Sequence, residues 1–339
     1  MTIAMLMSKD RLEQEHAMLN RLVVGLLDNG NQVIRVVPET ETETIPYYES
    51  TVTFAKRVEQ PMPISLLLRK QRREEVIELC LKNDVTTIVA YGKDATQLSQ
   101  DVSPSLEVHV MKEVISMKDA KKVKKNSPVW RWLAATPSIE KEITRRVGTD
   151  RVALVPLGVT NHNVKSTLDS NSSRCVVILD AAGDPRNTSE ILTSLKSFPN
   201  LHIFLEMTGK KQQRVWKTIS QLEMHNSVTC LRDISSLRKL IVQADLVVLP
   251  SKRMVVRTVF LEAMLCSIPI VATEIPGFDM LIDEESAFIL KDSWKKTLSI
   301  ALEERQFSKR IGDSGSNLVS EKYGSATQIA AFEAAFSLI

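Results

Sequence analysis

The chain has 339 residues, enough for about two domains that each bury a core of their own. With 43% hydrophobic and 25% charged residues, its composition excludes disordered, collagen-like and membrane-embedded proteins. The 44 Lys and Arg against 41 Asp and Glu leave a net charge of only +3, so neither nucleic acid nor an anionic membrane is the expected partner of the whole chain.

The first half alternates short apolar runs with segments of helical periodicity, a pattern typical of parallel sheets covered by helices. A first strand is expected at 3–7, followed by a helix that ends near Gly30. Further strands are expected at 33–37, 51–54, 85–91, 108–111, 133–136 and 152–156. The polar stretch 160–173 has the composition of a linker.

A second alternating series begins at Cys175. Its expected strands are 175–179, 201–205, 228–231, 246–249, 270–272 and 287–290, and its helices are 188–198, 212–224, 236–244 and 259–266. From residue 294 onward a helical pattern runs to the end, with Gly312, Gly315 and Gly324 as expected breaks. Two Rossmann-like domains follow, with ligands expected at the carboxyl ends of the strands.

Several features limit the possible cofactors and locations. The four cysteines form no Cys-x-x-Cys pair, so we expect reduced thiols, no disulfide and no metal. Glycine is scarce, at 11 residues, which argues against a glycine-rich phosphate loop. The amino terminus has no basic region before its short apolar run, and no apolar run is long enough to span a bilayer, so a cytoplasmic location is expected.

The most informative segment is 249–273, which reads Leu-Pro-Ser-Lys-Arg-Met-Val-Val-Arg-Thr-Val-Phe-Leu-Glu-Ala-Met-Leu-Cys-Ser-Ile-Pro-Ile-Val-Ala-Thr. It resembles the nucleotide-sugar-binding segment of family 4-like glycosyltransferases with the GT-B fold, whose pattern runs Pro-Ser, Glu, Gly-Phe-Gly, Leu-Glu-Ala-Met, Cys-Gly, Pro-Val-Val. The residues in register are Pro250, Ser251, Leu261, Glu262, Ala263, Met264, Cys266 and Pro269. Weaker similarities at 28–37, 153–159 and 243–251 extend the resemblance along the chain.

The resemblance implies an α/β fold with two Rossmann-like domains that face a central cleft. An acceptor domain would span 1–159, a linker 160–173 and a nucleotide-sugar domain 174–322. A last helix at 323–339 would cross back and pack on the first domain.

The resemblance also implies a function: retaining transfer of a sugar from a nucleotide-sugar donor to a glycan, lipid-linked or small-molecule acceptor, without a metal. Glu262 matches the carboxylate that holds the ribose. Arg257 and the helix start at Thr258 would face the diphosphate, and Arg186 is the cation left in the second domain's first loop. His109 lies near the family's cleft histidine, so Arg186 and His109 are the implied catalytic residues. The other implied donor contacts are Ser251, Met254 and Ile234.

The donor motif departs from the family pattern. Met254 stands eight places before Glu262, where the family has a carboxylate for the sugar, and Val255, Val256 and Arg257 replace Gly-Phe-Gly. These changes leave a second hypothesis open: a GT-B-like binding or partner subunit that is catalytically impaired. Ordinary interpretations also remain, with Glu262 as a helix-surface carboxylate and His109 as a half-buried strand histidine.

Two basic clusters lie in the first half. Arg69, Lys70, Arg72 and Arg73 follow an apolar run, while five lysines between 118 and 125 precede Trp130 and Trp132. Cations beside Trp are typical of peripheral membrane contact, so residues 118–132 are a candidate for docking on the inner membrane face. An ordinary solvated helix face is the alternative, and no nucleic-acid motif accompanies either cluster.

Overall fold

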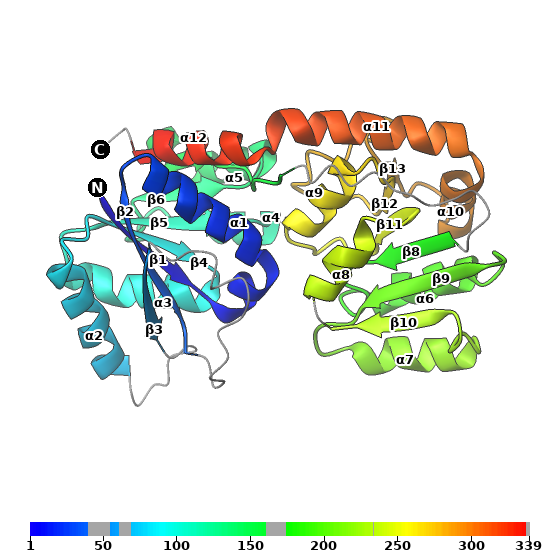
Figure 1. Cartoon of the computed structure of the whole chain (residues 1–339), viewed down its shortest axis with the longest axis horizontal. Coiled ribbons are helices and arrows are strands. Elements are labelled where there is room, and N and C mark those ends of the chain that lie inside the picture. The colour runs from blue at the N-terminus through cyan, green and yellow to red at the C-terminus, as the bar shows by residue number, and fades with distance from the viewer. Residues whose placement is uncertain (40–54, 61–68, 161–173, 233, 337–339) are drawn as a thin grey trace. The chain divides into compact units, whose positions relative to one another are not determined.

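The computed structural model describes residues 1–39, 55–60, 69–160, 174–232 and 234–336 (Figure 1). The chain forms two compact units, Met1–Gly158 with Ser325–Ile339 and Val159–Gly324. The strand expected at 51–54 and nearly all of the expected linker, 161–173, lie outside the described residues.

The first unit is a seven-stranded sheet with helices. Its strands are β1 (Thr2–Met7), β2 (Gln32–Pro38), β3 (Lys56–Gln60), β4 (Thr87–Tyr91), β5 (His109–Val114), β6 (Arg131–Ala134) and β7 (Val152–Leu154). Its helices are α1 (Lys9–Asp28), α2 (Arg69–Lys82), α3 (Lys93–Val102), α4 (Met117–Ala120), α5 (Pro137–Val147) and α12 (Ser325–Phe336), with short 3₁₀ turns at Ser103–Ser105 and Thr149–Arg151.

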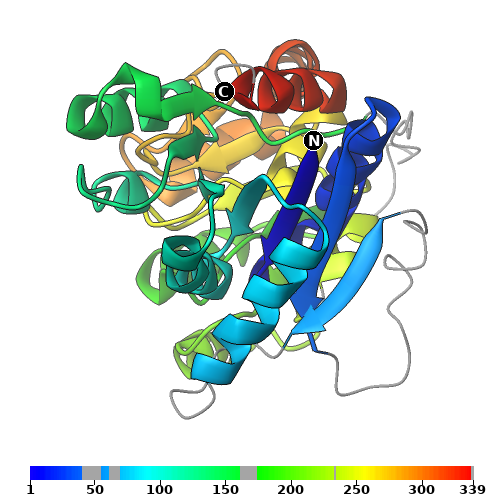
Figure 2. The same ribbon diagram turned by 90° about the vertical axis from the view of Figure 1, so that its left-hand side faces the viewer.

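The strand order in this sheet is β3-β2-β1-β4-β5-β6-β7, and every described pairing is parallel. Figure 2 shows β3 at the sheet edge. Apolar strand residues such as Leu6 and Ile88 pack against Val76 of α2 and Leu98 of α3 in a buried core. The order reverses between β1 and β4, which makes the sheet doubly wound. Helix α12 packs on α1, which confirms the expected return of the last helix to the first unit.

The second unit is a six-stranded parallel sheet. Its strands are β8 (Arg174–Ile178), β9 (Leu201–Glu206), β10 (Val228–Leu231), β11 (Leu246–Leu249), β12 (Ile270–Ala272) and β13 (Phe288–Ile289). Its helices are α6 (Pro185–Leu195), α7 (Gln212–Gln221), α8 (Ile234–Ile241), α9 (Thr258–Leu265), α10 (Trp294–Glu303) and α11 (Arg305–Lys322).

Its strand order is β10-β9-β8-β11-β12-β13, so the order reverses between β8 and β11. Apolar residues of the strands pack against Ile191 of α6, Val215 of α7 and Leu298 of α10 in one buried core. Each unit is thus a parallel, doubly wound sheet with helices, which confirms the expected Rossmann-like α/β fold class.

Two expected helix breaks are wrong. Gly312 and Gly315 lie inside α11, and the helix boundary falls at Glu304. A Cβ at Gly312 would lie 2.1 Å from the carbonyl oxygen of Ser267, and one at Gly315 would lie 3.1 Å from that of Ser286. The glycines therefore permit close packing of α11, while Gly324, which follows that helix, agrees with the expected break.

Candidate functional site

The carboxyl edge of the second sheet collects most of the residues expected to bind the donor. Ligands of doubly wound sheets bind outside the carboxyl ends of the strands where the strand order reverses, here between β8 and β11. The loop after β8 leads to α6, and the loop after β11 leads to α9 (Figure 1). The side-chain amide of Asn187 donates to the carbonyl oxygen of Pro250 at 2.8 Å, and this bond ties the start of α6 to the loop after β11.

The β11–α9 loop buries its own side chains. Ser251 is buried, and its Oγ accepts the backbone N–H of Arg253 at 3.2 Å. Met254 is only 6% exposed and Val256 is fully buried. The two apolar side chains therefore belong to the core of the unit, and the Met254 thioether is buried.

Arg257 immediately precedes α9, and its charge is balanced by a buried carboxylate. Its two terminal nitrogens donate to the two carboxylate oxygens of Glu206, both at 2.8 Å, and both residues are buried. Glu206 ends β9 and also accepts the backbone N–H of Asp180 at 2.8 Å. A bidentate pair of this kind fixes the position of the guanidinium. Arg257 and Glu206 together therefore carry no net charge at the site.

Asp180 adds a second carboxyl group to this edge. Burial and the neighbouring Glu206 carboxylate raise the pKa of Asp180 to about 6. A Cβ at Gly183 would lie 2.0 Å from an Asp180 carboxylate oxygen, so a larger residue there would displace the Asp180 side chain. The first loop of this unit is therefore acidic where the family has a phosphate-binding cation.

Glu262 lies in the second turn of α9 and forms an ion pair with Arg238 of α8. Arg238 also donates to Thr258 Oγ1 at 2.7 Å. Two of the expected donor-binding residues are thus brought together by an arginine that the sequence analysis did not single out. Ile234 begins α8, which places it on the helix that supplies Arg238, but its side chain lies outside the described part.

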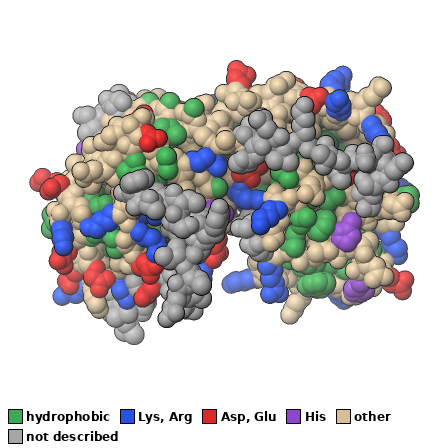
Figure 3. Space-filling model, viewed as in Figure 1, with side chains coloured by type: hydrophobic (Ala, Val, Ile, Leu, Met, Phe, Trp, Pro, Cys, Tyr) green, Lys and Arg blue, Asp and Glu red, His purple; other side chains and the backbone are tan. Residues whose placement is uncertain are grey.

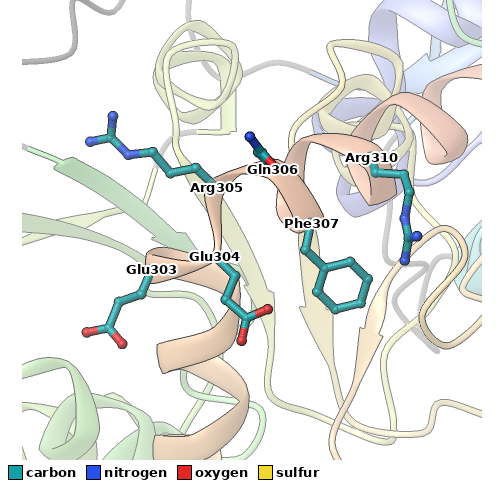
Figure 4. Close-up of a pocket in the computed structure, with 6 residues that line it drawn as sticks. All are labelled: Glu303, Glu304, Arg305, Gln306, Phe307 and Arg310. Carbon is teal, nitrogen blue, oxygen red and sulfur yellow. The ribbon is translucent and has the colours of Figure 1, made fainter.

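Arg186 lies in the first turn of α6 and is strongly exposed, with a side chain 89% accessible. It pairs with Glu190 at 3.5 Å and lines a hollow of about 400 Å³ together with Lys211 and Arg214. A larger hollow, about 700 Å³, lies where α10 meets α11, and its side chains fan out from the turn (Figure 4). That second hollow includes none of the expected donor residues.

His109 does not lie at the carboxyl edge of its sheet. It is the first residue of β5, and the strand's carboxyl end is Val114, five residues or roughly 16 Å further along. Its ring packs on Trp130 with the ring centroids 4.7 Å apart. The structure thus places it as a half-buried strand histidine against an aromatic neighbour.

The carboxyl edge of the first sheet carries a buried ion cluster that the sequence analysis missed. Arg11 donates two hydrogen bonds to Glu113, both at 2.7 Å, and lies 3.2 Å from Glu15. Burial and the Glu113 charge raise the pKa of the nearby Tyr91 hydroxyl well above its usual range. The sequence signal that could have indicated this cluster is the charged first turn of α1, Lys9 to Arg11, directly after the buried strand β1.

Segment 118–132 presents its lysines to solvent but not its aromatic rings. Trp132 is 4% exposed, and Trp130 is half-buried beneath the Arg131 guanidinium, 4.3 Å from its ring centroid. Among the residues described, no helix is both long and apolar enough to cross a bilayer. The described residues also contain no cluster of three or more His, Cys, Asp or Glu that could hold a metal ion.

The family model that matches this chain covers part of the second unit. Residues 181–304 match the family model described as Glycosyl transferases group 1, and no curated protein sequence matches. The family match includes residues 181–184 of the loop after β8, the loop after β11 and the whole of α9.

Solved structures resemble the chain over nearly its whole length. Anabaena HepE in complex with UDP-glucose has 14% identity, full coverage of both chains and a TM-score of 0.78. Sucrose-phosphate synthase from Thermosynechococcus elongatus also has 14% identity and a TM-score of 0.78, covering 99% of this chain and 98% of its own. The lipopolysaccharide outer core galactosyltransferase WaaB has 11% identity, full coverage of both chains and a TM-score of 0.70. The similarity inferred from residues 249–273 is therefore confirmed: the chain has the GT-B fold, and residues 181–304 match the Glycosyl transferases group 1 model.

Proposed function

We propose that the protein is a nucleotide-sugar-dependent glycosyltransferase whose second unit binds the donor. One observation carries the proposal: the family match over 181–304 includes Glu262, and the fold places its helix directly after the loop at the strand-order reversal. Fold alone does not determine function, so the proposal depends on this site.

Donor binding would use the residues gathered at this edge. The Glu262 carboxylate would accept hydrogen bonds from the ribose hydroxyls once its ion pair with Arg238 opens. Hydrogen bonds to a charged group contribute about 1.5–3 kcal/mol each. The free N–H groups at the start of α9 favour a diphosphate, and Arg257 would add charge only if its pair with Glu206 opened. Ser251 and Ile234 stay predicted donor contacts from the resemblance.

The finer parts of the proposal concern chemistry and acceptor. We propose retaining transfer without a metal, with a glycan, lipid-linked or small-molecule acceptor. Arg186 would stabilise the departing diphosphate, whereas His109 is left out because it lies at the amino end of its strand. UDP-glucose is the first donor to test, because HepE was solved with it. Any peripheral membrane contact through 118–132 would depend on the exposed lysines rather than on Trp132.

A second candidate is a catalytically impaired binding or partner subunit. It is favoured by the buried Met254 and by the two ion pairs that hold Arg257 and Glu262. Those pairs mean that a donor must compete with internal partners for both charges.

Turnover separates the two candidates. Release of free nucleotide from UDP, GDP and ADP sugars would be followed with and without simple sugar acceptors. We expect slow turnover, below the usual ~1–10³ s⁻¹ of enzymes. Binding without any turnover would support the second candidate, and failure of every nucleotide sugar to bind would contradict both.

A further inference from the structure

The outer edge of the second sheet is formed by β10, which pairs only with β9 among the described strands. Its sequence, Val-Thr-Cys-Leu, carries no charge, and all four residues are half-buried. The other described sheet edges are less open: β3 is charged, β13 has two residues, and β7 contacts α12. Proteins commonly protect an edge strand with charges, proline or a covering element, because its open backbone groups can pair with another strand. The unprotected edge of β10 therefore indicates an interaction surface.

We propose that β10 pairs antiparallel with β10 of a second copy of this chain, so that the two sheets become one continuous sheet. The carbonyl oxygens of Ser227 and Leu231 accept hydrogen bonds from β9, so alternation along the strand turns the N–H and C=O groups of Val228 and Cys230 outward. With Val228 of one copy opposite Cys230 of the other, each opposed pair exchanges both of its backbone hydrogen bonds. The two-fold axis then lies at Thr229, and the interface is self-complementary, as a two-fold dimer requires.

Helix α7 packs in the same core cluster as β10 and runs beside it (Figure 1). Arg232, directly after β10, donates a long hydrogen bond of 3.5 Å to Gln212, so the start of α7 is level with the end of β10. Thr218, which bonds to Ser189, marks the opposite side of the helix, where α6 packs. Trp216 lies one turn after Gln212, on the β10 side, and is 44% exposed. An exposed tryptophan therefore flanks the open strand edge.

The proposed pairing brings the two α7 helices side by side. Helix α7 connects β9 to β10 and covers this pair of strands, so the spacing of strands in a sheet puts the two helices roughly 10 Å apart, which is a packing distance. Their facing sides carry Gln212, Trp216 and Ser220, which are uncharged and four residues apart. Trp216 lies midway along α7, and Thr229 lies near the middle of β10, so the axis at Thr229 brings the two Trp216 side chains together.

Helix α7 also supplies the contact area that a strand edge lacks. A stable dimer buries about 800 Å² on each partner, which is more than a short strand provides. A central tryptophan is typical of the residues that dominate such interfaces. Figure 3 shows further hydrophobic side chains gathered over β9 and β10, and a continuous sheet would extend this face across both copies.

The charges at the two ends of β10 favour a second copy as the occupant. Arg232 follows the strand, Glu223 lies in the turn that precedes it, and both are exposed. Within the part of the chain that the structure describes, neither makes an ion pair. The antiparallel pairing places Arg232 of one copy opposite Asn226 of the other, and Glu223 lies three residues before Asn226. The same surface thus supplies both partners of an ion pair at each end of the interface.

Sedimentation velocity on the full chain measures the self-association, since none of the proposed donor residues lies in this surface. Cys230→Pro removes an outward N–H that β9 does not use, and Cys230→Val is its matched control, because valine keeps that N–H. Arg232→Glu and Glu223→Arg test the end charges singly and together. Unfolding midpoints show which variants are folded, and the charge variants leave the backbone of β10 unchanged.

Thr229→Cys tests the position of the axis. Residues that face each other in a non-hydrogen-bonded antiparallel pair have Cα atoms about 4.5 Å apart, within the range of a disulfide. Mild oxidation should therefore crosslink Thr229→Cys into a covalent dimer on a non-reducing gel. Ser197→Cys, at an exposed position just after α6, is the control and should stay monomeric on that gel.

We expect wild type and Cys230→Val to sediment as dimers. Cys230→Pro and each single charge reversal should associate at least tenfold more weakly, and the double reversal should restore the dimer. A monomeric wild type would overturn the proposal and leave the edge to a strand of another protein. A dimer that survives both single reversals, or that Thr229→Cys does not crosslink, would overturn it too, because the contact would then lie elsewhere.

Discussion

The pair between Arg257 and Glu206 is the most deeply buried ion pair of the second unit's carboxyl edge. Removing one partner of a buried pair leaves an uncompensated charge, whereas removing both does not. We expect Arg257→Met to lower the free energy of unfolding by about 3–5 kcal/mol. Urea unfolding of the variant and wild type measures this loss.

The double variant with Glu206→Gln is the control, because Gln can still accept the N–H of Asp180. Most of the lost stability should return in it. A double variant as unstable as the single one would show that Arg257 acts through packing and not through its charge.

The raised pKa of Asp180 predicts that the free energy of unfolding of the protein depends on pH. Its folded pKa of about 6 lies above the usual 3.8, so the folded state holds a proton that the unfolded chain releases between about pH 4 and 6. Stability is therefore lost as the pH rises through this window, by at most about 3 kcal/mol for a shift of two units. Asp180→Asn should be more stable than wild type at pH 8 and equal to it near pH 4, as urea unfolding at each pH would show. Equal stability at both pH values would contradict the assignment.

Sequence reasoning predicted that Ser251 follows a strand and that Thr258 and Glu262 lie in the next helix, because local residue order determines where a helix follows a strand. Sequence reasoning missed the ion-pair partners of Glu262 and Arg257. Arg238 lies 24 residues from Glu262, and Glu206 lies 51 residues from Arg257. Such pairs form only when helices and strands from distant segments pack. The structure puts His109 at the amino end of β5, because the direction of a strand decides which edge of the sheet each of its residues reaches.

At the scale of elements, buried parallel strands were predictable and exposed ones were not. The runs that became β1, β11 and β12 are short, apolar and buried, and their expected bounds agree with the structure to within one residue. Edge strand β3 reads Lys-Arg-Val-Glu-Gln and buries only Gln60, so it carries no apolar signal. Its helix neighbour α2 buries just Val76 and Cys80 and has equally weak periodicity.

Helix α11 gives a test of close packing. Ala is a better helix former than Gly by about 1 kcal/mol, so Gly312→Ala should stabilise an isolated helix. In the protein the new Cβ would meet the Ser267 backbone, and we expect a net loss of about 1–3 kcal/mol. Asn317→Ala, at an exposed position of the same helix, should be neutral or slightly stabilising. Thermal unfolding of both variants measures the contrast, and a stabilised Gly312→Ala would contradict the packing.

At the scale of the whole molecule, two doubly wound units account for the fold, and the fold accounts for the position of the site. The proposed donor site departs from the family pattern of the sequence analysis in several ways at once: Met254 is buried, the loop after β8 is acidic, and Arg238 and Arg257 are paired with Glu262 and Glu206. A single substitution should therefore not create an efficient enzyme.

Met254→Glu tests this expectation. The new carboxylate would enter a site that is 6% exposed, so we expect loss of at least ~2 kcal/mol of stability rather than gain of fast transfer. Nucleotide release from UDP-glucose, together with urea unfolding, measures both effects. A large gain in turnover without loss of stability would show that Met254 faces the sugar directly.

The central claim is that the Glu262 carboxylate holds the donor and that Arg238 competes for it. The most direct measurement is calorimetric titration of UDP, GDP and ADP sugars into wild type, Glu262→Gln and Arg238→Gln. We predict binding by wild type, affinity at least tenfold weaker in Glu262→Gln, and affinity equal to or tighter than wild type in Arg238→Gln, where the carboxylate is free. No binding by wild type, or equal affinities in wild type and Glu262→Gln, would contradict the claim.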